Sequence, residues 1–526
     1  MSLAPEFAGL LDPKAYDHPV AAVECVETPI SWVLLAGERA YKIKRPVRMP
    51  FVDQRSPARR AELCAEELRL NRRFAPELYL GVRPIVRVDG RLRIGGAGAV
   101  VEHAVCMRRF DRREELDRLV GAGTVTAAEL VRFGEELAAL QAGLQRAPAG
   151  SSWATAAEVR ALVLANLDQC VRASTAVGAA EEVGALRTPL LARLDALETR
   201  LADRHAGGFV RECHGDLHTR NIVRHGGRLL AFDCVEFEPA FRWIDVADDA
   251  AFLAADLAAL GARRLAHAFL QAWLAASGDW PAARLQPLYQ AHRALVRAKV
   301  VALSAAETAT AADVLRRRHA AYVAHAARML ADARPAVLLM CGVSGSGKTW
   351  LAERIAPALG ALHLRSDIER KRRAGLAPGQ RSGSALESGL YTASATADVY
   401  GHLLDCTRDV LAGGYPAIVD ATFLRPEDRR PWLELADALR VPLRLLLCHA
   451  PPAEIERRIE TRLQAGRDAS EADHRVLEWQ RQRAVPPGGG EAAQAIAADT
   501  SVPDIVQQVL ARLEADLGPG AGGRGP

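Results

Sequence analysis

The octapeptide GVSGSGKT at residues 342–349 constrains the fold of this chain more than any other stretch, because it matches the pattern GxxxxGK[ST] in full. Glycines let backbone amides converge on phosphate, Lys348 reaches the β- and γ-phosphates of a nucleotide, and the Thr349 hydroxyl binds magnesium. The apolar run AVLLMCG precedes the loop, and a helical pattern follows from Trp350. This context predicts a strand, a phosphate-binding loop and a helix. The predicted loop residues are Gly342, Val343, Ser344, Gly345, Ser346, Gly347, Lys348 and Thr349.

Strand and helix patterns alternate along the chain from Pro335 onward. Further strands are expected in ALHLRSD, AIVDAT and PLRLLLCHA, and each is followed by a helical pattern. This alternation is typical of an α/β fold with a parallel sheet. We therefore predict a P-loop kinase or ATPase domain over residues 334–517, with its boundary near Ala331 to Pro335. The Gly/Pro-rich residues 518–526 are expected to be a disordered tail.

Acidic residues stand where two of these strands end. Asp367, in LRSDIERK, is positioned to accept the proton of an acceptor hydroxyl, and Arg370 to hold the acceptor or a phosphate. Asp420, in AIVDAT, is positioned to help hold magnesium. For Asp367 the alternative role is an N-cap that starts a helix.

The segment EIERRIETRLQAGRDASEAD predicts an arginine-rich helix followed by a turn. Arg458 and Arg462 lie four residues apart, so they share one face of that helix. We expect this segment to be a lid that brings both arginines over the transferred phosphate as catalytic residues. The alternative is a solvated basic face.

A second pattern, HGDLHTRN at residues 214–221, points to a different kind of phosphate chemistry. Asp216 precedes Asn221 by five positions, and Asp233 in LLAFDC follows after a predicted hairpin with two glycines in its turn. Transfer of a phosphoryl group from ATP needs an acceptor for the hydroxyl proton and oxygen ligands for magnesium. Asp216 suits the base, while Asn221 and Asp233 suit the metal. The alternative is a polar turn and hairpin without chemistry.

Such a site also needs a cation on an upstream strand and a carboxylate that holds it. AYKIK offers Lys42 and Lys44 on one face of a predicted strand, and AELCAEEL offers Glu66 and Glu67 on a predicted helix. Only six of the 68 basic residues are lysines, so a retained lysine indicates chemistry that arginine does not provide. We favour Lys42 and leave the choice between the two glutamates open. Surface charge is the alternative.

The pieces AYKIK, HGDLHTRN, FDCVEF and WIDVADD together resemble the aminoglycoside phosphotransferase family, within the protein-kinase-like fold. The resemblance implies a two-lobed α+β domain over residues 1–333, with ATP in the cleft and a small-molecule hydroxyl as acceptor. It also implies that Asp245 braces the catalytic loop and that Met107 lies where the hinge touches adenine. One departure is that LLAGERA precedes Lys42 in place of a glycine-rich loop, which leaves a slow or degenerate kinase as an alternative.

The second half resembles P-loop kinases of the zeta-toxin, gluconate-kinase and polynucleotide-kinase type, on the pieces GVSGSGKT, SDIERK and RDASEAD. Taken together, the two halves resemble bacterial bifunctional aminoglycoside phosphotransferase/ATP-binding proteins. The resemblance implies two domains and does not identify an acceptor substrate.

Composition argues against some classes of binding partner. A net charge of +4 over 526 residues and the lack of basic–aromatic clusters argue against nucleic acid, with RKRR at 370–373 the one contrary run. No apolar run approaches the ~18 to 20 residues of a membrane span, and no signal peptide is evident. Nine cysteines without a CxxC pair favour reduced thiols over disulfides or a zinc site. We expect a cytoplasmic enzyme, and the sequence does not define its oligomeric state.

These observations predict a bifunctional phosphotransferase that uses ATP and magnesium in both halves, each acting on a hydroxyl group of a small molecule. One alternative is a P-loop kinase that acts on a nucleic-acid 5′-hydroxyl. Another is an ATP-regulated binding protein with a degenerate N-terminal kinase-like domain.

Overall fold

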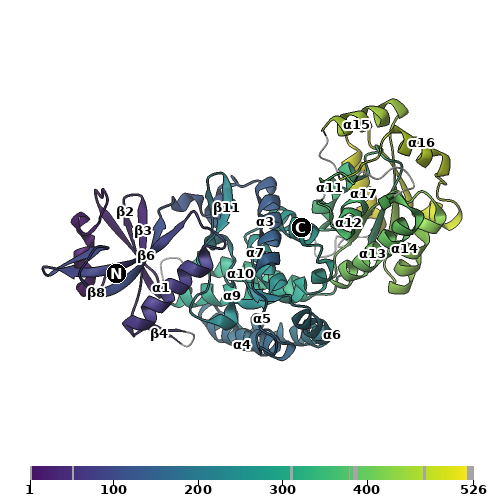
Figure 1. Ribbon diagram of the computed structural model, residues 1–526. Coiled ribbons are helices and arrows are strands. Elements are labelled where there is room, and N and C mark those ends of the chain that lie inside the picture. Colours follow the sequence, from purple (N-terminus) through teal and green to yellow (C-terminus); the bar gives the residue numbers. More distant parts are fainter. Residues whose placement is uncertain are drawn as a thin grey trace.

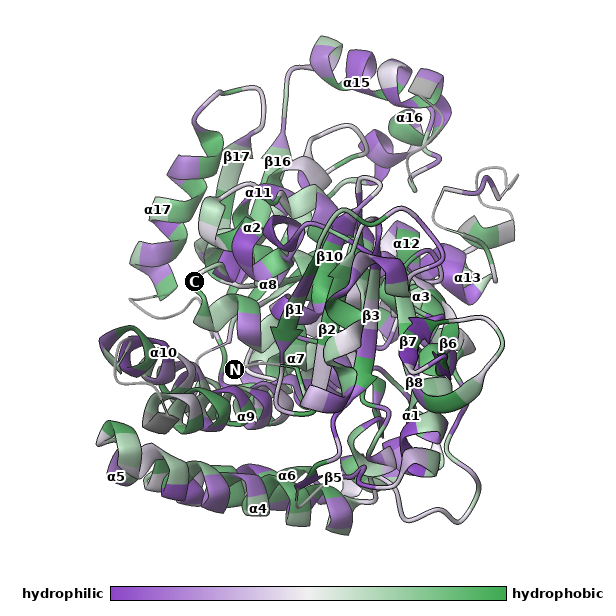
Figure 2. Cartoon of the chain, turned by 90° about the vertical axis from the view of Figure 1, so that its left-hand side faces the viewer, coloured by the Kyte–Doolittle hydropathy of each residue, from purple (hydrophilic) through white to green (hydrophobic). Residues whose placement is uncertain are grey.

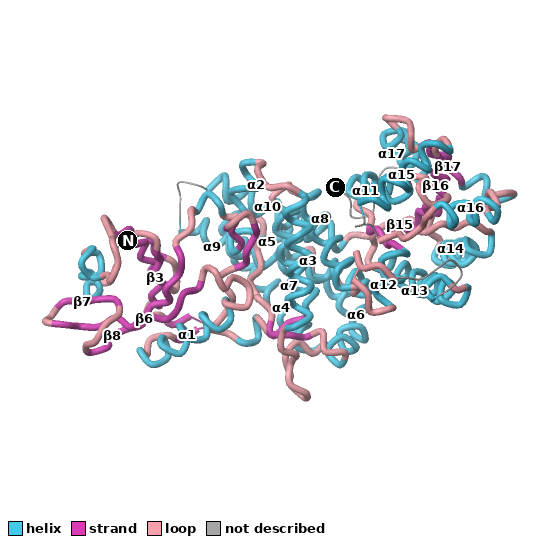
Figure 3. Tube along the Cα trace, turned by 45° about the horizontal axis from the view of Figure 1, so that its top comes forward, coloured by secondary structure: helices cyan, strands magenta, loops and turns pink. Residues whose placement is uncertain are grey.

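In the computed structural model, the described residues are 3–49, 52–307, 312–333, 335–377, 379–382, 389–465 and 469–517. Three parts follow one another along the chain (Figure 1): a sheet lobe up to residue 108, a helical lobe over residues 109–330, and a P-loop domain from residue 335. The two larger sheets lie at opposite ends, with helices between them (Figure 3). This arrangement confirms the predicted order of a two-lobed kinase-like domain and an α/β domain.

The sheet lobe is built on a six-stranded antiparallel sheet with the order β1-β2-β3-β8-β6-β7. Its strands are β1 Val23–Glu27, β2 Ser31–Ala36, β3 Arg39–Lys44, β6 Tyr79–Val88, β7 Arg91–Ile94 and β8 Ala99–Arg108, with a small pair β4 Arg48–Met49 and β5 Val52–Asp53. Along β3, Tyr41 and Ile43 join the core that also holds Phe7 and Leu10. Alternation therefore turns Lys42 and Lys44 to the opposite face, as predicted.

Helix α1 (Pro57–Asn71) is the predicted helix of this lobe. Proline occupies its first position, where a missing N–H costs nothing, and the helix ends before Pro76. It carries Glu66 and Glu67 beneath the sheet face that holds the two lysines.

The helical lobe contains most of the helices of the kinase-like domain. They are α2 Leu116–Ala122, α3 Ala127–Gly143, α4 Ala156–Ser174, α5 Ala180–Gly184, α6 Arg187–Ala206, α7 Val246–Ala259, α8 Arg263–Ser277, α9 Gln286–Glu307 and α10 Ala312–Leu330, with a 3-10 turn, η7, at Trp280–Arg284. Outer helices such as α4 alternate hydrophilic and hydrophobic residues (Figure 2).

The hairpin predicted after the HGDLHTRN motif is present as β10 Ile222–His225 and β11 Arg228–Ala231. Gly226 and Gly227 have φ angles of 57° and 75°, which a tight two-residue turn of this kind requires. A short pair, β9 Val210–Glu212 and β12 Trp243–Asp245, was not predicted and ties the two flanks of the loop together.

The P-loop domain has five parallel strands in the order β14-β15-β13-β16-β17, which confirms the predicted fold class. The strands are β13 Val337–Cys341, β14 Leu362–Arg365, β15 Ala417–Asp420, β16 Leu443–His449 and β17 Ala495–Asp499. Its helices are α11 Lys348–Leu359, α12 Ser366–Arg373, α13 Ala393–Ala412, α14 Pro426–Leu439, α15 Pro452–Ala465, α16 His474–Arg483 and α17 Ile505–Leu517. Strand β17 was not predicted, because its alanine-rich sequence has little strand propensity of its own.

One buried hydrophobic cluster runs from the helical lobe into the P-loop domain. It includes Trp273 and Trp280 on one side and Leu362, Val399 and Leu403 on the other. The predicted boundary falls between α10, which ends at Leu330, and β13, which begins at Val337. The predicted tail, residues 518–526, lies outside the described residues, and within those residues no helix is both long and apolar enough to span a membrane.

Candidate functional site

The GVSGSGKT loop connects β13 to α11, and α11 begins at Lys348 rather than at Trp350. Gly347 has a φ angle of 86°, and a Cβ atom there would lie 2.6 Å from the Thr500 hydroxyl oxygen, so only glycine fits. Lys348 Nζ donates hydrogen bonds to the carbonyls of Gly342 and Val343, at 2.9 and 2.8 Å. Burial lowers the pKa of the Lys348 ammonium from its usual value. The loop thus has the form of a phosphate cradle at a helix N-terminus.

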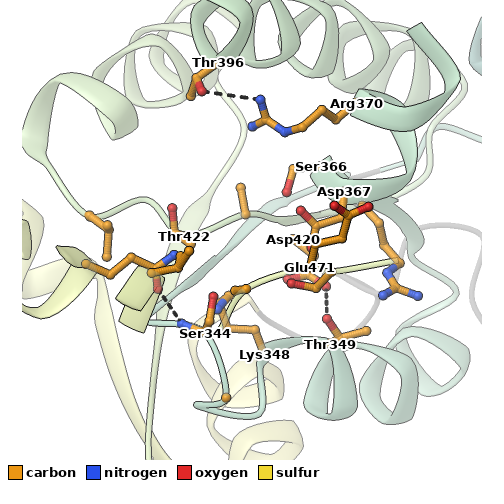
Figure 4. A pocket seen from close by; sticks show the side chains of 18 of the residues that line it. Ser344, Lys348, Thr349, Ser366, Asp367, Arg370, Thr396, Asp420, Thr422 and Glu471 are labelled. Atoms are coloured by element: carbon orange, nitrogen blue, oxygen red, sulfur yellow. Dashed lines mark hydrogen bonds between the residues drawn. The ribbon is translucent and has the colours of Figure 1, made fainter. Parts of the chain in front are cut away.

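Thr349 and Asp420 meet beside this loop (Figure 4). Thr349 Oγ1 donates a hydrogen bond of 2.6 Å to Asp420 Oδ2, and His363 Nε2 donates one of 3.2 Å to the same oxygen. Burial acts to raise the pKa of Asp420, but the hydrogen bond from His363 and the Lys348 ammonium outweigh it, so the pKa falls to about 2. A hydroxyl and an ionised carboxylate are oxygen ligands of the kind that magnesium prefers. His363 was not among the predicted site residues.

A cavity of about 600 Å³ opens above these residues and is lined by Asp367, Arg370, Asp420 and Glu471 (Figure 4). Asp367 is the second residue of α12, and among the described residues no side chain caps the start of that helix. The alternative N-cap role of Asp367 is therefore wrong, and its carboxylate is available to the cavity. Glu471, which was not predicted, accepts hydrogen bonds of 2.7 Å from the backbone and hydroxyl of Ser382.

Arg370 is largely buried and is held on the side of the cavity away from the loop. It donates hydrogen bonds to the Leu390 carbonyl at 2.7 Å and to Thr396 Oγ1 at 3.3 Å. These bonds hold the Arg370 guanidinium on the α13 side of the cavity, and its predicted contact with an acceptor or a phosphate stays a prediction.

The predicted lid arginines both line the cavity from α15. Arg458 is bonded to Glu454 Oε1 at 2.7 Å and to Thr500 Oγ1 at 2.8 Å. Arg462 donates to the Ala472 carbonyl at 2.6 Å. Arg458 thus supports the loop through Thr500, which donates to the Ser346 carbonyl at 2.9 Å. Part of the RDASEAD turn, residues 466–468, lies outside the described residues.

The HGDLHTRN segment brings Asp216 and Asn221 together in the helical lobe. Asn221 Nδ2 donates hydrogen bonds of 3.0 Å to both the carbonyl and the Oδ2 of Asp216, which leaves Asn221 Oδ1 for a metal. His218 Nδ1 accepts a 3.3 Å bond from the Arg220 backbone, so Nε2 carries the proton that faces Asp216 Oδ2 at 3.3 Å. Burial acts to raise the pKa of Asp216, but His218 outweighs it and holds the pKa well below its usual value.

Asp249 braces the start of this loop, and the expectation of Asp245 is wrong. Asp249 accepts hydrogen bonds from the backbone N–H groups of His214 and Gly215, at 3.2 and 2.9 Å. Asp245 instead pairs with Arg204 and caps α7 by accepting from the Ala247 N–H at 2.8 Å. Asp245 is the N-cap of α7 and its carboxylate is taken up by that cap and by Arg204, whereas the carboxylate of Asp249 reaches the loop backbone.

Glu67, and not Glu66, contacts the lysines of β3. Lys42 Nζ lies 2.9 Å from Glu67 Oε1 and also donates to Asp233, and Lys44 is bonded to Glu67 and to Glu236. Burial acts to raise the pKa of Glu67, but both lysines outweigh it and lower the pKa to about 2.

Glu66 and Lys44, the other two candidates, have structural contacts within the kinase-like domain. Glu66 is paired with Arg69 and Arg242, each at 2.7 to 2.8 Å, and so fastens α1 to the helical lobe. The side chain of Lys44 is fully buried, whereas Lys42 is 11% exposed and reaches Asp233. The geometry therefore favours Lys42 and Glu67 as the ATP-holding pair.

Met107 lies on β8 in an apolar cluster with Ala40, Val105 and Leu230, between the two lobes. Phe110 and Phe232 face each other nearby, with ring centroids 5.0 Å apart. The turn between β1 and β2 contains no glycine, and Gly37 lies in the next turn, between β2 and β3. Met107 thus lies in apolar surroundings, and its expected contact with adenine stays a prediction.

Comparisons with known proteins agree with this division. Residues 36–286 match the family model described as phosphotransferase enzyme family, and residues 337–487 match the one described as AAA domain. Among solved structures, a choline/ethanolamine kinase family protein from Mesorhizobium loti is 14% identical, with 62% of this chain and 91% of that one covered and a TM-score of 0.34. A gluconokinase from Sinorhizobium meliloti is 23% identical, with 35% and 97% covered and a TM-score of 0.26.

Two curated relatives span almost the whole chain. Uncharacterized proteins of Mycobacterium bovis and Mycobacterium tuberculosis (strain H37Rv) are each 31% identical over 463 residues, which cover 86% of this chain and 89% of theirs. The match extends across both domains rather than over one of them. The chain therefore belongs to the same family as these mycobacterial proteins, and it joins a domain of the phosphotransferase enzyme family to a P-loop kinase domain of the AAA type.

Proposed function

We propose that the protein is a bifunctional ATP-dependent phosphotransferase, in which each domain transfers the γ-phosphate of ATP to a hydroxyl group of a small molecule. The observation that supports this proposal is that each half holds a full set of groups for metal-assisted transfer. A lysine, a pair of oxygen ligands and a separate carboxylate lie together in both places. Either set is sufficient for phosphoryl transfer on chemical grounds.

In the kinase-like domain, Lys42 would bind the phosphates of ATP while Glu67 holds its ammonium in place. Asn221 Oδ1 and the Asp233 carboxylate fit magnesium, because both are hard oxygen donors. Magnesium would neutralise charge on the phosphates during transfer. Asp216, ionised because its pKa is low, would accept the proton of the acceptor hydroxyl.

In the P-loop domain, backbone amides of the loop and Lys348 would bind the phosphates. Thr349 and Asp420 fit magnesium on the same grounds. Asp367 would accept the hydroxyl proton, and Arg370, fixed by Leu390 and Thr396, would orient the acceptor beside it. Arg458 and Arg462 would face the transferred phosphate from α15.

ATP turnover of the full chain, with a panel of hydroxyl acceptors, tests the proposal. Asp216→Asn should silence one acceptor-dependent activity and Lys348→Ala another, and only the double variant should be silent throughout. Asp313→Asn, which changes an exposed aspartate on α10, is the matched control and should leave both activities intact. If Lys348→Ala alone removes all turnover, the kinase-like domain is a degenerate binding domain. If 5′-hydroxyl oligonucleotides are the acceptors that respond, the P-loop domain acts on nucleic acid.

A further inference from the structure

Strand β14 is the edge strand of the parallel sheet, and side chains of the helical lobe cover its open edge. Gln271 on α8 donates from Nε2 to the His363 carbonyl at 2.9 Å and accepts from the His363 N–H at 2.8 Å. His267 Nε2, one turn earlier, donates to the Ala361 carbonyl at 2.7 Å. The backbone N–H and C=O groups at the edge of a sheet need hydrogen-bond partners. Here the amide side chain of Gln271 makes the pair of hydrogen bonds that a neighbouring strand would make.

The side chain of His363, whose backbone is bonded to Gln271, reaches the P-loop site. The His363 side chain is 6% exposed, and its Nε2 donates to Asp420 Oδ2 at 3.2 Å. That oxygen also accepts the 2.6 Å bond from Thr349. A continuous series of hydrogen bonds therefore runs from α8 of one domain to the oxygen ligands of the other.

We propose that Gln271 and His363 are positioning residues for the Thr349–Asp420 pair, so that the kinase-like domain sets the geometry of the P-loop site. This inference rests on the proposed function only in taking Thr349 and Asp420 as the magnesium ligands. His363 holds Oδ2 of Asp420 and thereby fixes the rotation of the carboxylate. Gln271 fixes the backbone from which that imidazole projects.

The physical basis is the preorganisation of a metal ligand by its hydrogen-bond partners. A carboxylate that loses one of two donors rotates more freely, and removal of such a partner costs about 10- to 100-fold in metal affinity. Binding of the nucleotide without metal depends instead on Lys348 and the loop amides, which neither residue contacts. The two effects are therefore separable by measurement.

The test is isothermal titration calorimetry on the full chain, comparing the Kd for ADP with magnesium and the Kd for ADP in EDTA. The signal of the P-loop site is isolated by subtracting the same variant carrying Lys348→Ala. His363→Leu should reduce the magnesium enhancement of ADP affinity by roughly tenfold and leave the affinity in EDTA unchanged. His363→Gln, which keeps a donor, should retain most of the enhancement.

Gln271 lies outside the P-loop domain, so Gln271→Leu tests the positioning role if His363→Leu does not fold. This variant should also lower the magnesium enhancement of ADP affinity. Arg284→Ala is the control, because Arg284 is paired with Asp409 across the same interface but has no bond to His363 or Asp420. It should leave the enhancement unchanged.

The inference is overturned if His363→Leu and Gln271→Leu keep the wild-type enhancement. It is equally overturned if Arg284→Ala lowers the enhancement as much as Gln271→Leu does, since that would show a general effect of the interface. If the wild-type P-loop site shows no magnesium enhancement at all, the assignment of Thr349 and Asp420 in the proposed function fails together with the inference. That outcome is recognised before any variant is compared.

Discussion

The indole nitrogen of Trp280, in the helical lobe, donates a hydrogen bond of 2.9 Å to Glu369 Oε1 on α12 of the P-loop domain. Both residues are 1% exposed. Glu369 also accepts from Arg372 and His402, at 3.2 Å each. Because α12 carries Asp367 and Arg370, the helix that holds the proposed acceptor-binding residues is anchored on the other domain.

Replacing Trp280 with phenylalanine should destabilise the whole chain. Glu369 Oε1 would keep only the 3.5 Å contact with Arg372, and the loss of its short hydrogen bond costs about 1–3 kcal/mol, to which the smaller ring adds a cavity penalty. Urea denaturation followed by circular dichroism measures the loss in free energy of unfolding. Trp350→Phe changes an indole that is 38% exposed and should be close to neutral. Equal effects of the two changes would contradict this assignment.

Substitution of Lys42 should affect turnover, whereas substitution of Lys44 should affect stability. Lys44→Met leaves Glu67 and Glu236 facing each other in a buried site, which should cost about 3–5 kcal/mol of stability. Lys42→Met should instead lower turnover by the kinase-like domain about 100-fold, because it removes a charge aimed at the transferred group. ATP turnover in a Lys348→Ala background and urea denaturation separate the two outcomes. The assignment is reversed if Lys44→Met folds normally and loses only turnover.

Asp367→Asn should leave ATP affinity nearly unchanged and reduce transfer by the P-loop domain about 100-fold, as for loss of a general base. Titration calorimetry with ATP and an acceptor-dependent assay in an Asp216→Asn background measure both quantities. Glu353→Gln, also on the wall of the cavity, is the matched control. Collapse of ATP binding with transfer per bound ATP preserved would make Asp367 a binding residue instead.

A buried histidine should give part of the pH dependence of stability. His319 is 1% exposed, burial lowers its pKa below 6.5, and its Nε2 lies 2.9 Å from Ser174 Oγ. Below pH 6.5 the unfolded chain takes up a proton that the folded chain does not, so this contribution is present above pH 6.5 and is lost as the pH falls. The slope is at most about 1.4 kcal/mol per pH unit.

His319→Gln keeps a hydrogen-bonding side chain but removes the titration. Its free energy of unfolding should therefore fall less between pH 7 and pH 5 than that of the wild type. His474→Gln, at a side chain that is 49% exposed, serves as the comparison and should follow the wild type. Parallel pH profiles of His319→Gln and the wild type would refute the prediction.

Expression of the protein should not protect a sensitive bacterium from aminoglycosides. These antibiotics are polycations, and the surroundings of Asp216 include the buried guanidinium groups of Arg293 and Arg297. Arg293 is paired with Asp248 at 2.7 Å and Arg297 with Asp256 at 3.5 Å, so these carboxylates are already occupied and do not offer free negative charge to a polycation. Inhibitory concentrations with and without the protein measure the effect. Strong protection that Asp216→Asn abolishes would show the opposite.

Local patterns made the phosphate loop and the HGDLHTRN segment predictable, because each motif carries its chemistry within a few consecutive residues. The sequence favoured Lys42 but did not exclude Lys44, since alternation places both on one face and their distinct partners lie up to 192 residues away. Asp249 was missed for a related reason. The WIDVADD segment contains three aspartates, and only the direction of α7 determines which of them faces the loop.

His363 and Gln271 show a further limit of sequence reasoning. Each looks like an ordinary polar residue in a strand or a helix, and their contact joins positions 92 residues apart in two different folds. No sequence motif predicts such a contact, because it forms only where the two domains pack together. Strand β17 is similar, since its five residues become a strand only when β16 offers them an edge.

The covered edge of β14 also has a consequence for synthesis on the ribosome. Domains generally fold in the order in which they emerge, and an uncovered strand edge invites pairing with other chains. Gln271 and His267 leave the ribosome before β14 does, so the surface that receives this strand is complete when the strand appears. The order of the two domains along the polypeptide thus protects the nascent sheet, and a rearranged gene that placed the P-loop domain first would produce a chain prone to aggregation.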